Sequence, residues 1–66
     1  EYQSMNVYVA HGDSTMVLTL KEVNADYIVL ERVVGEKKLK GWIPISKIEG
    51  IYETGEVSPT IVIYVG

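Results

Sequence analysis

Short runs of β-branched and aromatic residues make up most of this chain, and Gly, Asn, Asp or Pro separates each run from the next. Runs of this kind are typical of β-strands. Apolar residues do not recur at helical spacing for three turns in any window. We therefore predict an all-β fold with little or no helix. The expected strands cover residues 6–10, 15–23, 27–34, 38–45, 48–53 and 60–65.

Glycine and proline positions refine this pattern. Gly35 supplies the positive φ that a tight turn between the third and fourth strands requires. Pro44 lacks a backbone donor, so the end of the fourth strand is expected at a sheet edge or outside the sheet. Gly41 and Gly50 are expected positions for bends, because short strands must curve to bury their apolar side chains.

Length and composition narrow the fold further. The 66 residues are expected to form one domain, because so short a chain buries only roughly 60% of its unfolded surface. The absence of cysteine excludes disulfide bonds and thiolate metal sites. No apolar run approaches the ~20 residues that cross a bilayer, so no membrane contact is expected. A hydrophobic content of 47% argues against disorder.

The first four residues are treated separately. Residues 1–4 resemble what an engineered protease site leaves in front of a native start at Met5. We therefore expect 1–4 to be a vector-derived remnant and 5–66 to form a single small β-barrel domain.

Alternation along the strands predicts which side chains are buried. One apolar set repeats at every second position and is expected to face inward. This set comprises Val7, Val9, Leu18, Leu20, Ile28, Leu30, Leu39, Ile43, Ile45, Ile48 and Ile51. A sheet of short strands must bend strongly to bury these residues. We therefore predict a small barrel of five to six antiparallel strands in meander order.

The predicted outer face also carries many apolar residues. The last strand has no polar alternation, and a strand that is apolar on both faces is normally covered on both. We therefore predict a homo-oligomer joined through this strand, whose residues are Ile61, Val62, Ile63, Tyr64 and Val65. Alternatively, the strand closes a monomeric barrel, and its outer residues are scattered surface apolars.

Two groups of polar residues have both a chemical and a simpler interpretation. His11, Asp13 and Ser14 include the residue types of a hydrolytic triad, but neighbours on one turn rarely converge as a triad requires. A β-turn is favoured, and a metal site would lack a third ligand. An acidic patch, typical of a solvated face, comprises Glu49, Glu53 and Glu56. We therefore predict no enzyme activity, no cofactor and no metal site.

The best candidate surface for a ligand or partner lies on the predicted strand 38–45. Alternate positions of this strand place basic and aromatic residues on one face. With the neighbouring strand, the candidate face comprises Arg32, Lys38, Lys40, Trp42, Pro44 and Tyr27. A Trp beside Pro and Tyr can hold a peptide, or can stack bases while Lys binds phosphate. Alternatively, Trp42 packs against a neighbouring subunit or closes the end of its own barrel.

Several segments together resemble an Sm-like small barrel. Within residues 7–52 they are Val7-Tyr8-Val9, the Gly12-Asp13 turn, the run Asp26 to Glu31 and the segment Trp42 to Ile48. The resemblance implies an SH3-like topology and a ring or other homo-oligomer joined edge to edge. RNA-binding members carry an Asn after the Asp of the third strand and an Arg-Gly pair near the final strand. This chain has neither, so no RNA-binding residue is carried over.

These observations favour a non-catalytic interaction module that self-associates and scaffolds or regulates a protein partner. The alternative is a nucleic-acid-binding Sm-like protein that uses the basic hairpin and Trp42. A net charge of −3 favours a protein partner over a polyanion. Because the sequence shows no targeting signal, we expect a cytoplasmic location.

Overall fold

The computed structural model describes residues 4–55 and 59–66 and shows an all-β chain, as predicted. Its strands are β1 (Met5–His11), β2 (Ser14–Val23), β3 (Tyr27–Val34), β4 (Lys37–Pro44), β5 (Ile48–Glu53) and β6 (Ile61–Val65). A 3-10 helix, η1 (Ile45–Lys47), lies between β4 and β5. Each strand begins and ends within one residue of its predicted boundaries, because turn residues end each apolar run.

Two-residue loops join β1 to β2 and β3 to β4. Gly12 (φ 58°) and Gly35 (φ 61°) open these loops with the positive φ that tight hairpin turns require. The role predicted for Gly35 is therefore confirmed. These turns fix the register of both hairpins, and so decide which side chains share a face.

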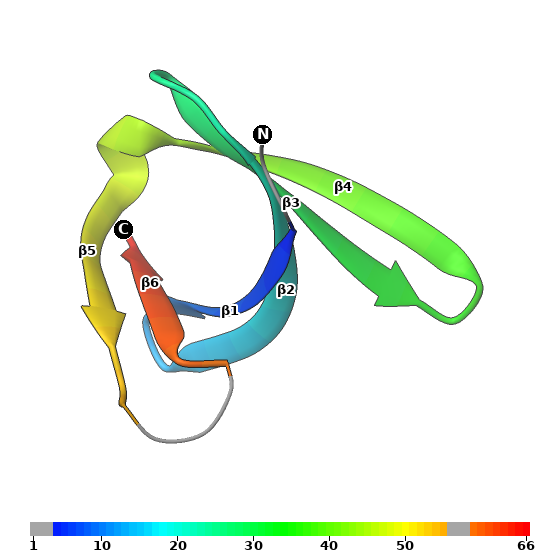
Figure 1. Cartoon of the computed structure of the whole chain (residues 1–66), viewed down its shortest axis with the longest axis horizontal. Helices are drawn as coiled ribbons and strands as arrows, with labels where there is room; N and C mark the ends of the chain where they lie inside the picture. The colour runs from blue at the N-terminus through cyan, green and yellow to red at the C-terminus, as the bar shows by residue number, and fades with distance from the viewer. Residues whose placement is uncertain (1–3, 56–58) are drawn as a thin grey trace.

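The strands form a sheet in the order β4-β3-β2-β1-β6-β5. From β1 to β4 they are consecutive antiparallel neighbours, as the meander prediction requires. The prediction is wrong for β6, which lies between β1 and β5 and runs parallel to β1 (Figure 1). β6 is antiparallel to β5 and lies next to β1. The direction in which β5 leaves η1 therefore sets the direction of β6, which runs parallel to β1.

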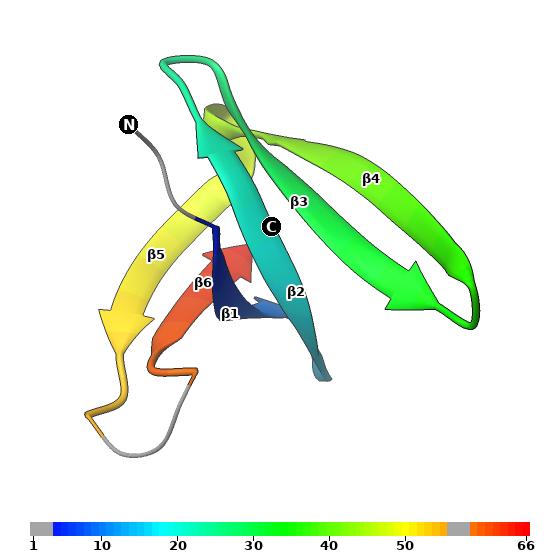
Figure 2. The same ribbon diagram turned by 45° about the vertical axis from the view of Figure 1, so that its right-hand side comes forward.

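The sheet curls strongly but does not close. The strand register shifts between Leu20 and Glu22 in β2 and between Ile48 and Gly50 in β5, and such irregularities bend a strand. The predicted bend at Gly50 is confirmed, whereas Gly41 keeps regular pairing with β3. η1 connects the two edge strands, β4 and β5, which extend from it to opposite sides of the molecule (Figures 1 and 2). The fold is an open, barrel-like sheet.

The concave side of the sheet holds the core. Its buried and partly buried members are Val7, Val9, Leu18, Leu20, Ile28, Leu30, Ile43, Ile48, Ile61, Ile63 and Val65. Most of the residues predicted to face inward are among them. Leu39, Ile45 and Ile51 are corrections, because all three are exposed. Among the described residues no strand lies between β4 and β5, so each of these strands has one edge without a neighbouring strand.

Backbone hydrogen bonds fix η1 and thereby the divergence of β4 from β5. The N–H of Ile45 donates to the carbonyl of Asp26 in the β2–β3 turn (2.9 Å), and the N–H of Gly66 donates to the carbonyl of Lys47 (2.9 Å). The chain therefore holds η1 at both of its ends. In the part of the chain that the structure describes, this three-residue element is the sole helix, and it is far too short to cross a membrane.

Candidate functional site

The β3–β4 hairpin brings most of the predicted basic and aromatic residues to one face. From the base of the hairpin toward its tip, the opposite pairs on this face are Tyr27–Pro44, Val29–Trp42, Glu31–Lys40 and Val33–Lys38. Directly opposite residues of an antiparallel pair share a face. The structure therefore unites five of the six predicted residues on the outer side of the sheet.

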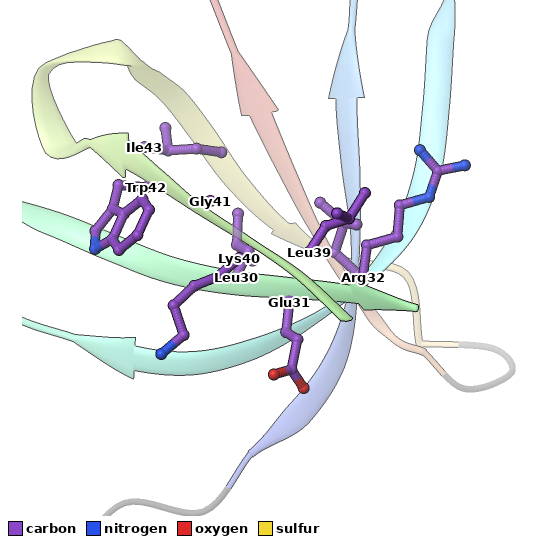
Figure 3. Close-up of a pocket in the computed structure, with 9 residues that line it drawn as sticks. Leu30, Glu31, Arg32, Leu39, Lys40, Gly41, Trp42 and Ile43 are labelled. Atoms are coloured by element: carbon purple, nitrogen blue, oxygen red, sulfur yellow. The ribbon is translucent and has the colours of Figure 1, made fainter. Parts of the chain in front are cut away.

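Arg32, the sixth predicted residue, lies on the opposite face. It pairs with Leu39, so it shares a face with Leu39 and not with Lys38 and Lys40. In Figure 3, the Arg32 side chain points away from that of Lys40. Its guanidinium Nη1 lies 4.0 Å from the Sδ of Met16 on β2. The predicted face is corrected to exclude Arg32, which lies on the core side of the hairpin.

Trp42 occupies an exposed position on the outer face. Its side chain is 59% exposed, so Trp42 does not close the end of its own barrel. The alternation of the strand puts Val29 on the outer face, yet its side chain is only 5% exposed. Val29 pairs with Trp42 on one side and with Glu22 on the other. Trp42 therefore flanks a buried apolar residue and still presents more than half of its surface to solvent or to a partner.

A pocket of about 230 Å³ opens beside β4 on the core side of the hairpin (Figure 3). Leu18, Leu30, Leu39 and Ile43 supply apolar side chains to its lining, together with Arg32. Gly41 is part of the lining and adds no side chain to the space. A Cβ built on Gly41 would meet no atom within 4 Å. Because Gly41 belongs to β4, the pocket lies beside a strand that forms one edge of the sheet.

The opposite edge of the sheet exposes a core-facing residue. Ile51 of β5 pairs with the buried Ile63, so its side chain faces the core side, yet it is 63% exposed. Glu49 and Glu53 lie on either side of it along β5, and both are exposed. This edge is therefore acidic and carries an uncovered apolar side chain.

The strand predicted to mediate self-association lies inside the sheet. Both edges of β6 are paired, one with β1 and one with β5, so its backbone is not available to a second copy. Ile63 is buried, and Ile61, Val62 and Val65 are half-buried. Tyr64 is exposed, and its ring meets that of Tyr52 edge to face, with centroids 5.4 Å apart. Only the outer side-chain face of β6 is open to a partner.

The structure does not bring together the three polar residues of the β1–β2 turn as a triad. His11, Asp13 and Ser14 are exposed at the β1–β2 turn, and His11 Nδ1 lies 3.3 Å from the carbonyl oxygen of Val65. A carbonyl only accepts, so this hydrogen bond requires a proton on Nδ1. Within the described residues, no group of three or more His, Cys, Asp and Glu is arranged to hold a metal ion. Glu56 lies outside the described residues.

The pocket and the exposure of Ile51 are not predicted from the sequence. A glycine inside a strand marks a place where no side chain fills the space, so the run Leu39-Gly41-Ile43 contained a signal for the pocket. No local signal indicates that the barrel stays open beside Ile51. Comparison of the chain with protein-family models, with curated proteins and with solved structures finds no match.

Proposed function

We propose that this chain is a non-catalytic interaction module that self-associates by pairing β5 of one copy with β4 of the next. The observation that carries the proposal is the open sheet. In the described part of the chain, the sheet ends at β4 and β5, and each edge has an uncovered apolar residue on its core side. These residues are Leu39, 50% exposed, and Ile51.

Pairing of the two edges would remove two unfavourable features, namely unpaired backbone groups and exposed apolar side chains. An edge strand presents a row of backbone N–H and C=O groups that readily pair with another chain. The core-facing side chains at both edges would also leave water when a second strand covers them. Both edge strands are long enough for an extended ladder, since β4 has eight residues and β5 has six.

The charges of the two edges favour pairing of unlike edges. β4 carries Lys37, Lys38 and Lys40, whereas β5 carries Glu49 and Glu53, and all five are exposed. Pairing of β4 with a second β4 would bring lysines together, and pairing of two β5 strands would bring glutamates together. The favoured contact is therefore head to tail. Repeated head-to-tail contacts generate a ring if they close and a filament if they do not.

The Sm-like resemblance of residues 7–52 supports the same mode, because it implies homo-oligomers joined edge to edge. Such an assembly would repeat the outer face of Trp42, Pro44 and Tyr27 in every copy. A repeated surface of this kind binds a protein partner with avidity, which suits a scaffolding or regulatory role.

Analytical ultracentrifugation over a range of protein concentrations tests the proposal. We expect a multimer that dissociates on dilution, and a Leu39→Lys or Ile51→Lys variant that sediments as a folded monomer. Val33→Lys is the matched control, because Val33 is as exposed as Ile51 but lies on β3, which is not an edge strand. Wild-type protein that remains a monomer at every concentration, in low and in high salt, would contradict the proposal.

A second candidate function is the binding of single-stranded nucleic acid. It is favoured by one observation, the exposed Trp42 ring on the same face as Lys38 and Lys40. Phosphate-driven binding weakens steeply with added salt, whereas an apolar edge contact does not. A fluorescent oligonucleotide is titrated with wild type and with Trp42→Ala at two salt concentrations. Absence of binding by wild type at low salt removes this candidate.

A further inference from the structure

The pocket beside Gly41 is large enough to hold a side chain from another molecule. Its volume is about 230 Å³. An apolar cavity of about 150 Å³ already holds a benzene-sized group. Leu39 and Ile43 lie on either side of Gly41 on the same face of β4, and Leu30, 3% exposed, lies directly opposite it. A side chain that enters here would therefore contact apolar groups on three sides.

We propose that this pocket receives the Ile51 side chain of a second copy of the chain. The inference rests on the edge pairing proposed above and specifies its register and direction. When β5 of one copy extends the sheet at β4 of another, the core sides of the two strands form one continuous face. Ile51 is the exposed apolar residue on the core side of β5, so it is the side chain that suits the apolar pocket beside Gly41.

Charge complementarity supports an antiparallel register with Ile51 opposite Gly41. In that register, Glu53 of the second copy falls opposite Leu39, on the pocket side. Lys37 lies two residues from Leu39 on the same face of β4. Glu53 of one copy and Lys37 of the other would therefore lie diagonally opposite as a charged pair beside the buried Ile51.

Engineered cysteines test the register directly, because the chain has no cysteine of its own. A Gly41→Cys protein is mixed with an Ile51→Cys protein under mild oxidation. Directly opposite strand residues have Cα atoms about 4.5–5.5 Å apart, which suits a disulfide. We expect a covalent heterodimer from this mixture. The control mixture, Lys38→Cys with Ile51→Cys, places the thiols on opposite faces and should give little product.

The outcomes separate this inference from the proposed function. If wild type sediments as a multimer but the Gly41–Ile51 mixture gives no more disulfide than the control mixture, the register is wrong and edge pairing survives. If wild type never associates, both are overturned. Sedimentation of the uncrosslinked proteins distinguishes the two results.

Further variants probe the contacts without a crosslink. Gly41→Leu fills the pocket from its own side, and it should raise the dissociation constant at least about tenfold while the circular dichroism spectrum stays unchanged. Lys37→Glu and Glu53→Lys should each weaken association, and their combination in one chain should restore it, because a head-to-tail contact reunites the swapped charges. Unchanged association of Gly41→Leu, or no recovery in the double variant, would overturn the proposed contact.

Discussion

The ring of Tyr52 meets the ring of Tyr64 edge to face across the β5–β6 hairpin, with centroids 5.4 Å apart and planes at 89°. Gly50 permits this arrangement, because a Cβ at that position would lie 2.7 Å from Cε1 of Tyr52. Tyr64 also pairs with Ala10, which is buried although it points to the outer side of the sheet. The two rings thus form an apolar cover on the outside of the β5–β6–β1 region.

A substitution in this ring pair distinguishes the two possible surfaces for self-association, which are the sheet edges and the outer face of β6. Tyr64→Lys removes the ring pair but leaves both sheet edges intact. We expect the free energy of unfolding to fall by about 0.5–1.5 kcal/mol, while the sedimenting mass remains that of wild type. Denaturant unfolding and ultracentrifugation measure the two effects. A folded Tyr64→Lys monomer would instead place the contact on the outer face of β6, as the sequence alone suggests.

Leu30 is central to the core and should be the costliest residue to truncate. It is buried on β3, so Leu30→Ala should lower the free energy of unfolding by about 2–5 kcal/mol, enough to unfold a domain of this size. Val33→Ala on the same strand changes an exposed side chain and should stay within about 0.5 kcal/mol of wild type. Similar losses for both variants, measured by urea denaturation, would contradict the described core.

Two glycines should respond to alanine with opposite signs. Gly35 has a φ of 61°, so Gly35→Ala should destabilise the protein by roughly 1–2 kcal/mol, although a Cβ there meets no atom within 4 Å. Gly41 lies in a regular strand with equal space around it, so Gly41→Ala should stabilise by about 0.5–1 kcal/mol. Thermal unfolding of the protein diluted to its monomer checks both, and a destabilised Gly41→Ala monomer would show that the chain itself fills the space beside β4.

Asn24 organises the turn between β2 and β3. Its Oδ1 accepts hydrogen bonds from the N–H groups of Asp26 (2.9 Å) and Tyr27 (3.0 Å). Asn24→Ala should therefore cost about 1 kcal/mol of stability. Asn24→Asp keeps the accepting oxygen and should retain most of it. Chemical denaturation of both variants tests this role, and equal losses would show that the side-chain oxygen is not the stabilising group.

The strands and hairpin turns could be predicted from the sequence because their signals are local. Apolar runs end at turn residues, and Gly35 opens its turn with the expected positive φ. The shared face of Lys38, Lys40 and Trp42 follows in the same way from the two-residue period of a strand. The face of Arg32 was also within reach of the sequence, because a two-residue loop after Val34 fixes the pairing of Arg32 with Leu39.

The position of β6 and the open barrel could not be predicted from alternation. Alternation decides which face a side chain takes, and it carries no information about which strand lies alongside. Ile61 and Ile63 would face the core beside any neighbour, so nothing in their spacing indicates parallel pairing with β1. Ile51 was expected inside for the same reason, and its exposure depends on a strand neighbour that the sheet does not provide.

The parallel contact between β1 and β6 has a consequence for how the chain acquires its structure. It joins segments near the two ends of the chain, as does the hydrogen bond between His11 and Val65, which are 54 positions apart. Contacts of such high sequence separation form late and slowly, because the entropy of a long loop must be lost first. During synthesis, β5 can join the sheet only after β6 has left the ribosome. Removal of β6 would therefore detach two strands rather than one.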